Sequence, residues 1–433
     1  MKTRPSIRPE LGAENSEAHA PGLGVEVDQG AAAQFQFLKA WVRGVRSLPR
    51  AFWIIAVGSS IAAAFACLSL PSIFTYDPII FWNSWHFWGL RNMPYRSFTW
   101  EFPPLSFVPS FLARWMSANS FQAFFGQFMT MASLIALPFL IAVNPIRARG
   151  IAVRWLVAGT FGFACAWYRF DPLALVFVCW AIWAIESDRP AALPIVLGFA
   201  CRLWPALLIV GLIIKGRGKD TKNTFLLMTA TLVGWIAWSP SGFRTFLRFR
   251  QGKGFEIESF VGAMAMFRSH TVLFISGAQV VRLGNWEILD PVMTVAWLSF
   301  AVVLTAFAKR RGANWLYVTG GLVFFLLLSS RLFSAQYIVW GLPFVVLAWS
   351  NGVRYITAVY TASCFLTGVA LTRFTQYAVD NEKFVAVVFT LRNLLVLWCG
   401  VMLIREAFRA ETTPASTPTL RSLLRHDPAT GAR

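Results

Sequence analysis

Residues 121–143 read FQAFFGQFMTMASLIALPFLIAV, an apolar run without a charged side chain. About 20 such residues let a helix cross the hydrocarbon core of a bilayer, so this run predicts a membrane-spanning helix. Comparable apolar runs recur at 51–70, 292–308, 317–328 and 384–403. The sequence shows no barrel-like alternation, and helices satisfy their own backbone groups in lipid. We therefore expect an all-α polytopic membrane protein.

The composition supports this class. Of the 433 residues, 57% are hydrophobic and only 14% are charged, which is more apolar than a soluble domain of ordinary composition. The net charge of +19 is spread over short loops and tails, so it favours membrane lipids as partners and argues against nucleic acid. The six cysteines and four histidines are isolated from one another. We expect neither a disulfide framework, nor a metal site, nor a bound cofactor.

Basic residues orient the chain in the membrane. Four cations within 39–50 precede the first apolar run, and two more within 405–409 follow the last one, so both ends are predicted to be cytoplasmic. Residues 1–34 and 410–433 are expected to be disordered cytoplasmic tails. The transmembrane domain is then 35–409.

Two arrangements of the first half satisfy this orientation. If 103–118 and 191–213 both cross the membrane, the chain has twelve spans but leaves the arginines of 147–154 outside. If 103–118 lies at the interface and 191–213 is a re-entrant hairpin broken at Arg202, every basic cluster returns to the cytoplasm. We favour this second arrangement, with ten crossings and a hairpin, because an arginine inside an apolar run is costly unless it lines a polar cavity.

The first external loop, 71–102, is where we expect chemistry. Asp77 begins an aromatic-rich segment that would lie along the membrane surface and hold the acid at the level of lipid phosphates. The alternative is that this Asp-Pro pair simply starts a helix. The same dipeptide recurs at Asp171 and Asp290, where helix capping alone is our expectation.

A second external loop, 240–286, is unusually basic. Glu256 and Glu258 are its acids, and its cations are Arg244, Arg248, Arg250, Lys253, Arg268 and Arg282. So many external cations oppose the positive-inside bias, which indicates an anionic ligand such as a lipid-linked sugar phosphate. The alternative is a solvated loop or one bound to lipid head groups.

Ordered motifs then carry a family resemblance. Asp77 follows the first span, 90–95 is similar to a Gly-x-x-Pro-Tyr element, and 101–105 is similar to Glu-Tyr-Pro-Pro-Leu. Residues 253–259, KGFEIES, are similar to Arg-Gly-Leu-Gln-Ile-Glu-Ser, and 333–343 to Phe-Ser-Pro-Gln-Tyr-x-x-Trp-x-x-Pro. Together these segments resemble the GT-C-fold membrane glycosyltransferases, most nearly the polyprenol-phosphate-mannose-dependent mannosyltransferases of actinobacterial cell envelopes.

The likeness covers 51 to about 405, with departures. Arg202, Lys253 and Ala335 stand where relatives have Lys, Arg and Pro. The resemblance implies a GT-C fold of about 10–12 transmembrane helices, with interfacial helices in the first external loop. It also implies inverting transfer of a hexose, most nearly mannose, from a polyprenyl-phosphate sugar to a lipid or glycan acceptor on the extracytoplasmic face of the cell membrane.

In that mechanism Asp77 is the catalytic base that takes the acceptor proton. The residues expected to bind substrate are Tyr95, Glu101, Arg202, Arg250, Lys253, Glu258, Arg331, Gln336 and Tyr337. The cations among them would meet the charge of the departing phosphate. The alternative function is a transporter or flippase of lipid-linked sugars, although the two halves show no clear repeat of the kind such proteins carry.

Overall fold

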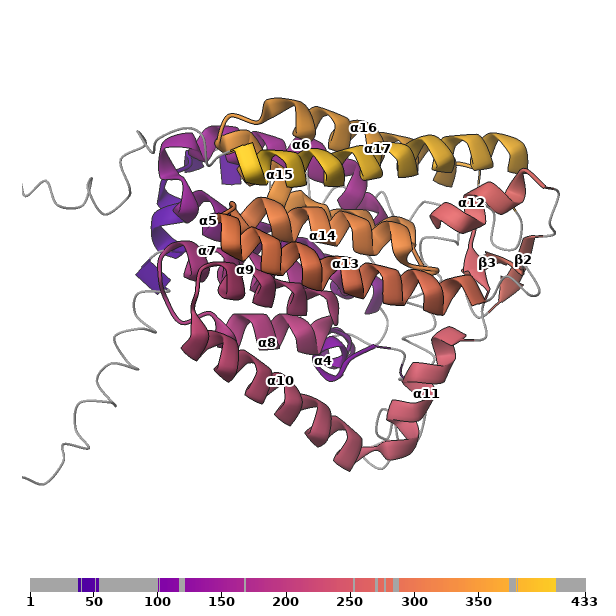
Figure 1. The fold of residues 1–433 in the computed structure, drawn as a ribbon, viewed down its shortest axis with the longest axis horizontal. Helices are drawn as coiled ribbons and strands as arrows, with labels where there is room; N and C mark the ends of the chain where they lie inside the picture. The colour runs from indigo at the N-terminus through magenta and orange to yellow at the C-terminus, as the bar shows by residue number, and fades with distance from the viewer. Residues whose placement is uncertain are drawn as a thin grey trace, which may run out of the picture. The chain divides into compact units, whose positions relative to one another are not determined.

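A computed structural model describes residues 38–39, 41–50, 52–53, 100, 102–116, 121–166, 169–251, 254–268, 272–275, 278–282, 288–373, 379 and 381–409. The chain divides into two compact units, Met1–Lys39 and Ala40–Arg433, and the helices and strands labelled in Figure 1 all belong to the second. Among the described residues, the helices long and apolar enough to cross a bilayer are Phe124–Val143, Leu289–Arg311 and Glu382–Arg409. The chain is thus mostly helical with candidate membrane spans, while the GT-C fold and the number of crossings stay predictions.

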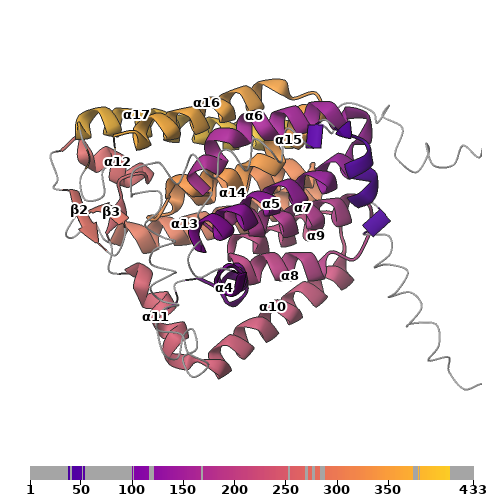
Figure 2. The same ribbon diagram turned by 180° about the vertical axis from the view of Figure 1, so that it is seen from behind.

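The helices of the first half follow the predicted apolar runs closely. They are η1 (Pro104–Ser106), α4 (Phe107–Met116), α5 (Phe121–Val143), η2 (Pro145–Arg147), α6 (Ala148–Ala166) and α7 (Asp171–Glu186). Figures 1 and 2 both view α4 nearly along its axis, so α4 runs steeply across α5. Whether 103–118 crosses the membrane stays a prediction.

The second half is also helical. Its helices are α10 (Gly218–Trp238), α11 (Pro240–Gln251), α12 (Phe260–Met266), α13 (Leu289–Arg311), α14 (Trp315–Ser329), η5 (Ala335–Gly341), α15 (Leu342–Ser350), α16 (Arg354–Leu371) and α17 (Glu382–Arg409). Helix α13 ends on Gly312, whose φ of +63° is a left-handed conformation that glycine adopts without strain. The three cations of its last turn lie at the negative end of the helix dipole, where positive charge stabilises the helix.

Small residues let α14 and α17 pack closely against each other. A Cβ on Gly321 would lie 2.5 Å from the side chain of Ile404 and 3.2 Å from the carbonyl oxygen of Gly400. Close approach through glycines is a common way for helices to associate inside a bilayer, where apolar side chains gain little from leaving lipid. The glycines therefore fix the place of α17 against the rest of the bundle.

Helix α13 carries large apolar side chains on its surface. Val292, Val295, Leu298, Val302 and Val303 are all exposed. A soluble protein rarely leaves so continuous an apolar face in contact with water. The face is the one that a membrane-spanning helix presents to lipid.

Residues 191–213 form a helical hairpin, as predicted. Its parts are α8 (Ala192–Cys201), η3 (Trp204–Leu207) and α9 (Leu208–Ile214). Lys215, directly after α9, donates a hydrogen bond of 3.3 Å to the carbonyl oxygen of Ile185 at the end of α7. Arg202, in the break between α8 and η3, reaches Asp171 at the opposite end of α7. The segment therefore begins and ends at one end of α7 and turns back at the other.

The basic segments of the bundle gather at that shared end. Contacts that join them there are Trp315 with Glu186, Asn314 with Ala407, Tyr355 with Glu406, and Arg154 with Trp349. These contacts bring the starts of α6, α14 and α16 together with the ends of α7, α15 and α17. The cations of 147–154, 215–222, 309–311 and 405–409 consequently lie at one end, as the favoured topology requires.

A small antiparallel sheet lies at the opposite end of the bundle (Figure 1). Its strands are β1 (Phe255–Glu256), β2 (Val272–Ile275) and β3 (Ala278–Val281), in the order β1-β3-β2. These strands depart from the all-α expectation, because two to four residues are too few to reveal an alternating pattern. Buried Ile257 shares a core cluster with Val281 and with Phe389 of α17, which anchors the sheet to the bundle.

Candidate active site

A buried ion pair lies at the turning point of the hairpin. Nη2 of Arg202 is 2.7 Å from Oδ2 of Asp171, and the two residues are 3% and 0% exposed. Arg202 adopts an extended conformation after the last turn of α8, so its side chain leaves the helix and points to the first turn of α7. We expected Asp171 to be a helix cap, and this was wrong. Phe170 is the cap residue, and the Asp171 carboxylate is used by Arg202.

Aromatic rings surround this pair. The indole N–H of Trp340 donates a hydrogen bond of 2.7 Å to Oδ1 of Asp171. The Trp340 ring stacks between Trp204, at 5.1 Å between centroids, and Tyr337, at 4.6 Å. The guanidinium of Arg202 lies over the ring of Tyr337 at 5.5 Å. A cation among aromatic faces is partly desolvated, so it attracts an anion more strongly than it would in water.

Two buried N–H groups near the pair lack an acceptor among the described residues. They are Nε of Arg202 and Nε1 of Trp204. A buried donor left without an acceptor costs about 1–3 kcal/mol. Arg202 therefore has one N–H donor left over after it pairs with Asp171, and its guanidinium lies over the rings of Phe102 and Tyr337.

A second set of polar contacts joins the 254–259 segment to the start of η5. The Ser334 hydroxyl donates to Oε2 of Glu256, and the Ala335 amide donates to Oε2 of Glu258 at 2.5 Å. The Ser334–Ala335 turn thereby holds the two carboxyl groups of the 254–259 segment close to each other and to Tyr337, which follows two residues later. Glu258 was an expected site residue, whereas Glu256 was not.

Arg331 links the same loop to α13. Its Nε donates to the carbonyl oxygen of Gly254 at 3.0 Å, and its Nη1 lies 3.2 Å from Oδ2 of Asp290. Its Nη2 is buried without an acceptor in the part of the chain that the structure describes. Asp290, too, was expected to cap a helix, but the cap position is Ile288 and the carboxylate pairs with Arg331. Asp290 and Asp171 thus both pair with a distant arginine.

Arg169, in the connection from α6 to α7, links the Arg202–Asp171 pair to the group around Glu256 and Glu258. Its charge interacts with Tyr337, Arg202, Asp171 and Glu256. Burial lowers the pKa of Arg169, Tyr337 opposes the lowering, and the neighbouring Arg202 adds to it. The two groups thus form a single electrostatic unit at the end of the bundle opposite the basic clusters.

The charge state of Glu258 is unusual for a carboxyl group. Burial, and next the charge of Glu256, raise the pKa of Glu258 from an ordinary 4.5 to about 8. Arg392, the Ala335 amide and Arg169 act in the opposite direction. Near neutral pH a larger fraction of Glu258 is therefore protonated than of an ordinary glutamate, and a protonated carboxyl group can donate a hydrogen bond.

The structure brings together four of the expected site residues. Arg202 and Tyr337 meet around Asp171, and Glu258 and Arg331 meet around the 254–259 segment. Gln336 is buried in η5. The remaining expected residues, Asp77, Tyr95, Glu101 and Lys253, lie outside the described residues, and of Arg250 the backbone alone is described, within α11.

Arg169, Arg392 and the role of Trp340 as a partner of Asp171 were not predicted. Arg392 had a usable signal, because it is an arginine inside the apolar run 384–403, and charged residues within such runs usually serve a function. Arg169 directly precedes the Phe-Asp-Pro element at 170–172, which gave a weaker hint. Within the described residues, no group of three or more acidic, histidine or cysteine side chains gathers as a metal-binding cluster.

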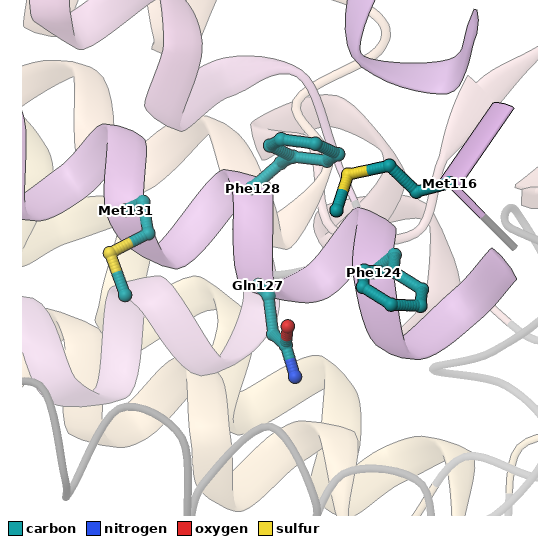
Figure 3. Close-up of a pocket in the computed structure, with 5 residues that line it drawn as sticks. All are labelled: Met116, Phe124, Gln127, Phe128 and Met131. Atoms are coloured by element: carbon teal, nitrogen blue, oxygen red, sulfur yellow. The ribbon is translucent and has the colours of Figure 1, made fainter. Parts of the chain in front are cut away.

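A surface groove elsewhere does not share this chemistry. It has a volume of about 190 Å³ and is lined by Met116, Phe124, Gln127, Phe128 and Met131 of α4 and α5 (Figure 3). These side chains are apolar apart from one amide, and none is ionisable. The groove therefore offers neither an acid nor a base, and the buried polar groups around Asp171 and Glu258 form the better candidate site.

Comparisons with known proteins do not assign the chain to a family. The chain matches no protein-family model, no curated protein and no solved structure. The resemblance to GT-C-fold glycosyltransferases therefore stays a prediction based on the motifs.

Proposed function

We propose that the chain is an integral membrane glycosyltransferase of the cell membrane. It moves a hexose, mannose in our proposal, from a polyprenyl-phosphate sugar to a lipid or glycan acceptor. The basic end of the bundle is cytoplasmic in this proposal, because short cytoplasmic loops carry an excess of Lys and Arg. The site around Asp171 and Glu258, at the other end, then faces the extracytoplasmic side.

One observation carries the proposal. Arg202 is buried at the turning point of the hairpin, and its Nε has no acceptor among the described residues. Arginine binds phosphate oxygens through a two-pronged set of donors, and it does so most strongly where water is excluded. Nη2 of Arg331 offers a second free donor at the same end of the bundle. These donors suit a phosphate group whose charge grows as it departs.

The proposed reaction is a single displacement. The acceptor hydroxyl oxygen forms a bond to the anomeric carbon, while the bond from that carbon to the phosphate oxygen breaks. Polyprenyl phosphate leaves with the bonding electron pair, and the acceptor proton passes to the carboxylate of Asp77. Attack opposite the leaving group inverts the anomeric configuration. Glu258 and Gln336 would orient the sugar hydroxyls, with Tyr95, Glu101 and Tyr337 as further substrate contacts.

The test uses the purified chain in nanodiscs, supplied with polyprenyl-phosphate mannose and an acceptor lipid extract. We expect release of polyprenyl phosphate only when acceptor is present. D77N should lower transfer by about 100-fold or more, as loss of a general base does. D188N is the matched control, because Asp188 is an exposed carboxylate in the turn after α7. It should leave transfer unchanged.

The outcomes separate the proposal from its rival. Full turnover by D77N would remove Asp77 from the mechanism. Movement of labelled donor lipid between vesicle leaflets, without release of polyprenyl phosphate under any acceptor condition, would instead identify a transporter of lipid-linked sugars. R202K retains the charge but loses the two-pronged geometry, so we expect the KM for donor to rise about tenfold.

A further inference from the structure

Arg392 is a fully buried arginine in the middle of a candidate membrane span. It lies in α17, about 15 Å along the helix from Glu382 at a rise of 1.5 Å per residue, and it is 0% exposed. A buried guanidinium is costly unless other groups stabilise it, and ionisable residues inside spans usually serve a function. Its contacts therefore indicate what it does.

Those contacts converge on the external loop. Nη2 of Arg392 donates to the backbone carbonyl oxygen of Glu258, and Nδ2 of Asn393 donates to the same oxygen at 3.3 Å. The Arg392 guanidinium also lies 4.0 Å from the ring centre of Phe333 and 5.0 Å from that of Phe389. Two neighbouring side chains of α17 thus bind one carbonyl group, and two rings hold the guanidinium in place.

The carboxyl group of Glu258 is fixed from the other side. Its Oε2 accepts the Ala335 amide at 2.5 Å, so backbone and side chain of Glu258 are each held by a different element. The charged groups that act on this carboxyl are Glu256 from β1, Arg392 from α17 and Arg169 from the α6–α7 connection. Glu256 opposes ionisation of Glu258, and the two arginines favour it.

We propose that Arg392 is a positioning residue of the site, one that fixes Glu258 beside Glu256 and supplies the positive charge that lets both acids share the site. The last helix, whose Arg392 is 134 residues from Glu258 in the sequence, is thereby coupled to the two glutamates of the 254–259 segment. The consequence for turnover rests on the proposed glycosyltransferase function. The effect on the ionisation of Glu258 does not.

Removing the Arg392 charge should make Glu258 harder to ionise. Burial and Glu256 already raise the pKa of Glu258 to about 8, and Arg392 lowers it. Without that charge the pKa must rise further, so a larger fraction of Glu258 stays protonated at any pH near neutrality. A role for Arg392 in packing alone predicts no such shift.

The test is a pH titration of the chain in nanodiscs by infrared difference spectroscopy. The carbonyl band of the protonated Glu258 carboxyl is assigned by its absence in E258Q. We expect its midpoint near pH 8 in the unmodified chain, and about one pH unit higher in R392Q, because a nearby opposite charge lowers the pKa of a carboxyl group by about one unit or more. R392K keeps the charge, so it should keep the midpoint while lowering transfer.

R154Q is the matched control. Arg154 also lies over an aromatic ring, 3.9 Å from that of Trp349, but at the basic end of the bundle. It should leave the Glu258 midpoint unchanged. An unchanged midpoint in R392Q, or an equal shift in R154Q, would overturn the inference. Should R392Q fail to accumulate, R392K with both normal transfer and a normal midpoint would overturn it as well.

The titration also separates this inference from the proposed function. Absence of transfer by the unmodified chain would end the glycosyltransferase proposal, yet the Glu258 midpoint would still report on Arg392.

Discussion

Arg202 and Asp171 form an ion pair of 2.7 Å that joins the turning point of the α8–α9 hairpin to the first turn of α7. Both residues are buried, and Asp171 also accepts a hydrogen bond from Trp340. The pair therefore connects three elements that lie far apart in sequence. It fixes the turning point of the hairpin beside the first turn of α7, and with it the position of the unpaired N–H of Arg202.

The first prediction concerns this pair. D171N leaves the Arg202 charge buried without its counter-ion, which costs about 3–5 kcal/mol in comparable cases. We expect a marked loss of stability in thermal unfolding of the detergent-solubilised chain. R409Q is the control, since Arg409 is 60% exposed where it pairs with Glu406, and exposed pairs contribute about 1 kcal/mol or less. Equal stability of D171N and R409Q would contradict a structural role for the pair.

A double variant distinguishes folding from function at the same position. Replacing both charges, in D171L combined with R202M, removes the uncompensated charge and should recover most of the stability lost in D171N. It also removes the Arg202 donors that we propose bind the phosphate. We therefore expect a folded chain without transfer activity, measured by release of polyprenyl phosphate. Recovery of both stability and activity would show that Arg202 does not contact the donor.

The helices and the hairpin follow from local features of the sequence. Apolar runs of spanning length are visible without knowledge of contacts, and α5 begins and ends at the ends of the predicted run 121–143. The break at Arg202 was also predictable, because Pro205 follows it and an arginine inside an apolar run requires a polar environment.

The partners within the site were not predictable in this way. Trp340 and Asp171 are 169 residues apart, and Arg392 and Glu258 are 134 apart, so no local pattern connects either pair. The Asp-Pro dipeptides were misleading for a physical reason. They do lie in the first turns of α7 and α13, but helix-starting sequence does not reveal whether the carboxylate bonds its own backbone or a distant arginine.

The second functional prediction concerns Arg331. Its Nη2 is the donor available for a phosphate oxygen, whereas its Nη1 is used by Asp290. R331K should raise the KM for the polyprenyl-phosphate donor about tenfold, equivalent to about 1.4 kcal/mol. D290N removes the ion pair but leaves Nη2 in place, so we expect a change in KM of less than about threefold. A larger effect from D290N than from R331K would indicate that the ion pair, and not the free donor, matters.

The stability of the chain should depend on Glu258 between about pH 4.5 and pH 8. Its pKa is raised from 4.5 to about 8 by burial and then by Glu256, so in this interval the unfolded chain releases a proton that the folded chain retains. The contribution of Glu258 to stability is complete below pH 4.5 and is lost as the pH rises to about 8. We expect the difference in Tm between the unmodified chain and E258Q to change by a few degrees over this range. A constant difference would contradict the raised pKa.

The turn that carries both glutamates should tolerate no added volume at Gly262. A Cβ there would lie 2.0 Å from the carbonyl oxygen of Glu256, which also accepts the Ser259 hydroxyl at 2.7 Å. G262A must therefore displace the Glu256–Ser259 turn, at a cost of about 1–3 kcal/mol, and we expect transfer activity to fall with it. G218A is the control, because nothing lies within 4 Å of a Cβ on Gly218 at the start of α10. Normal activity in G262A would mean that the two glutamates act without being held by this turn.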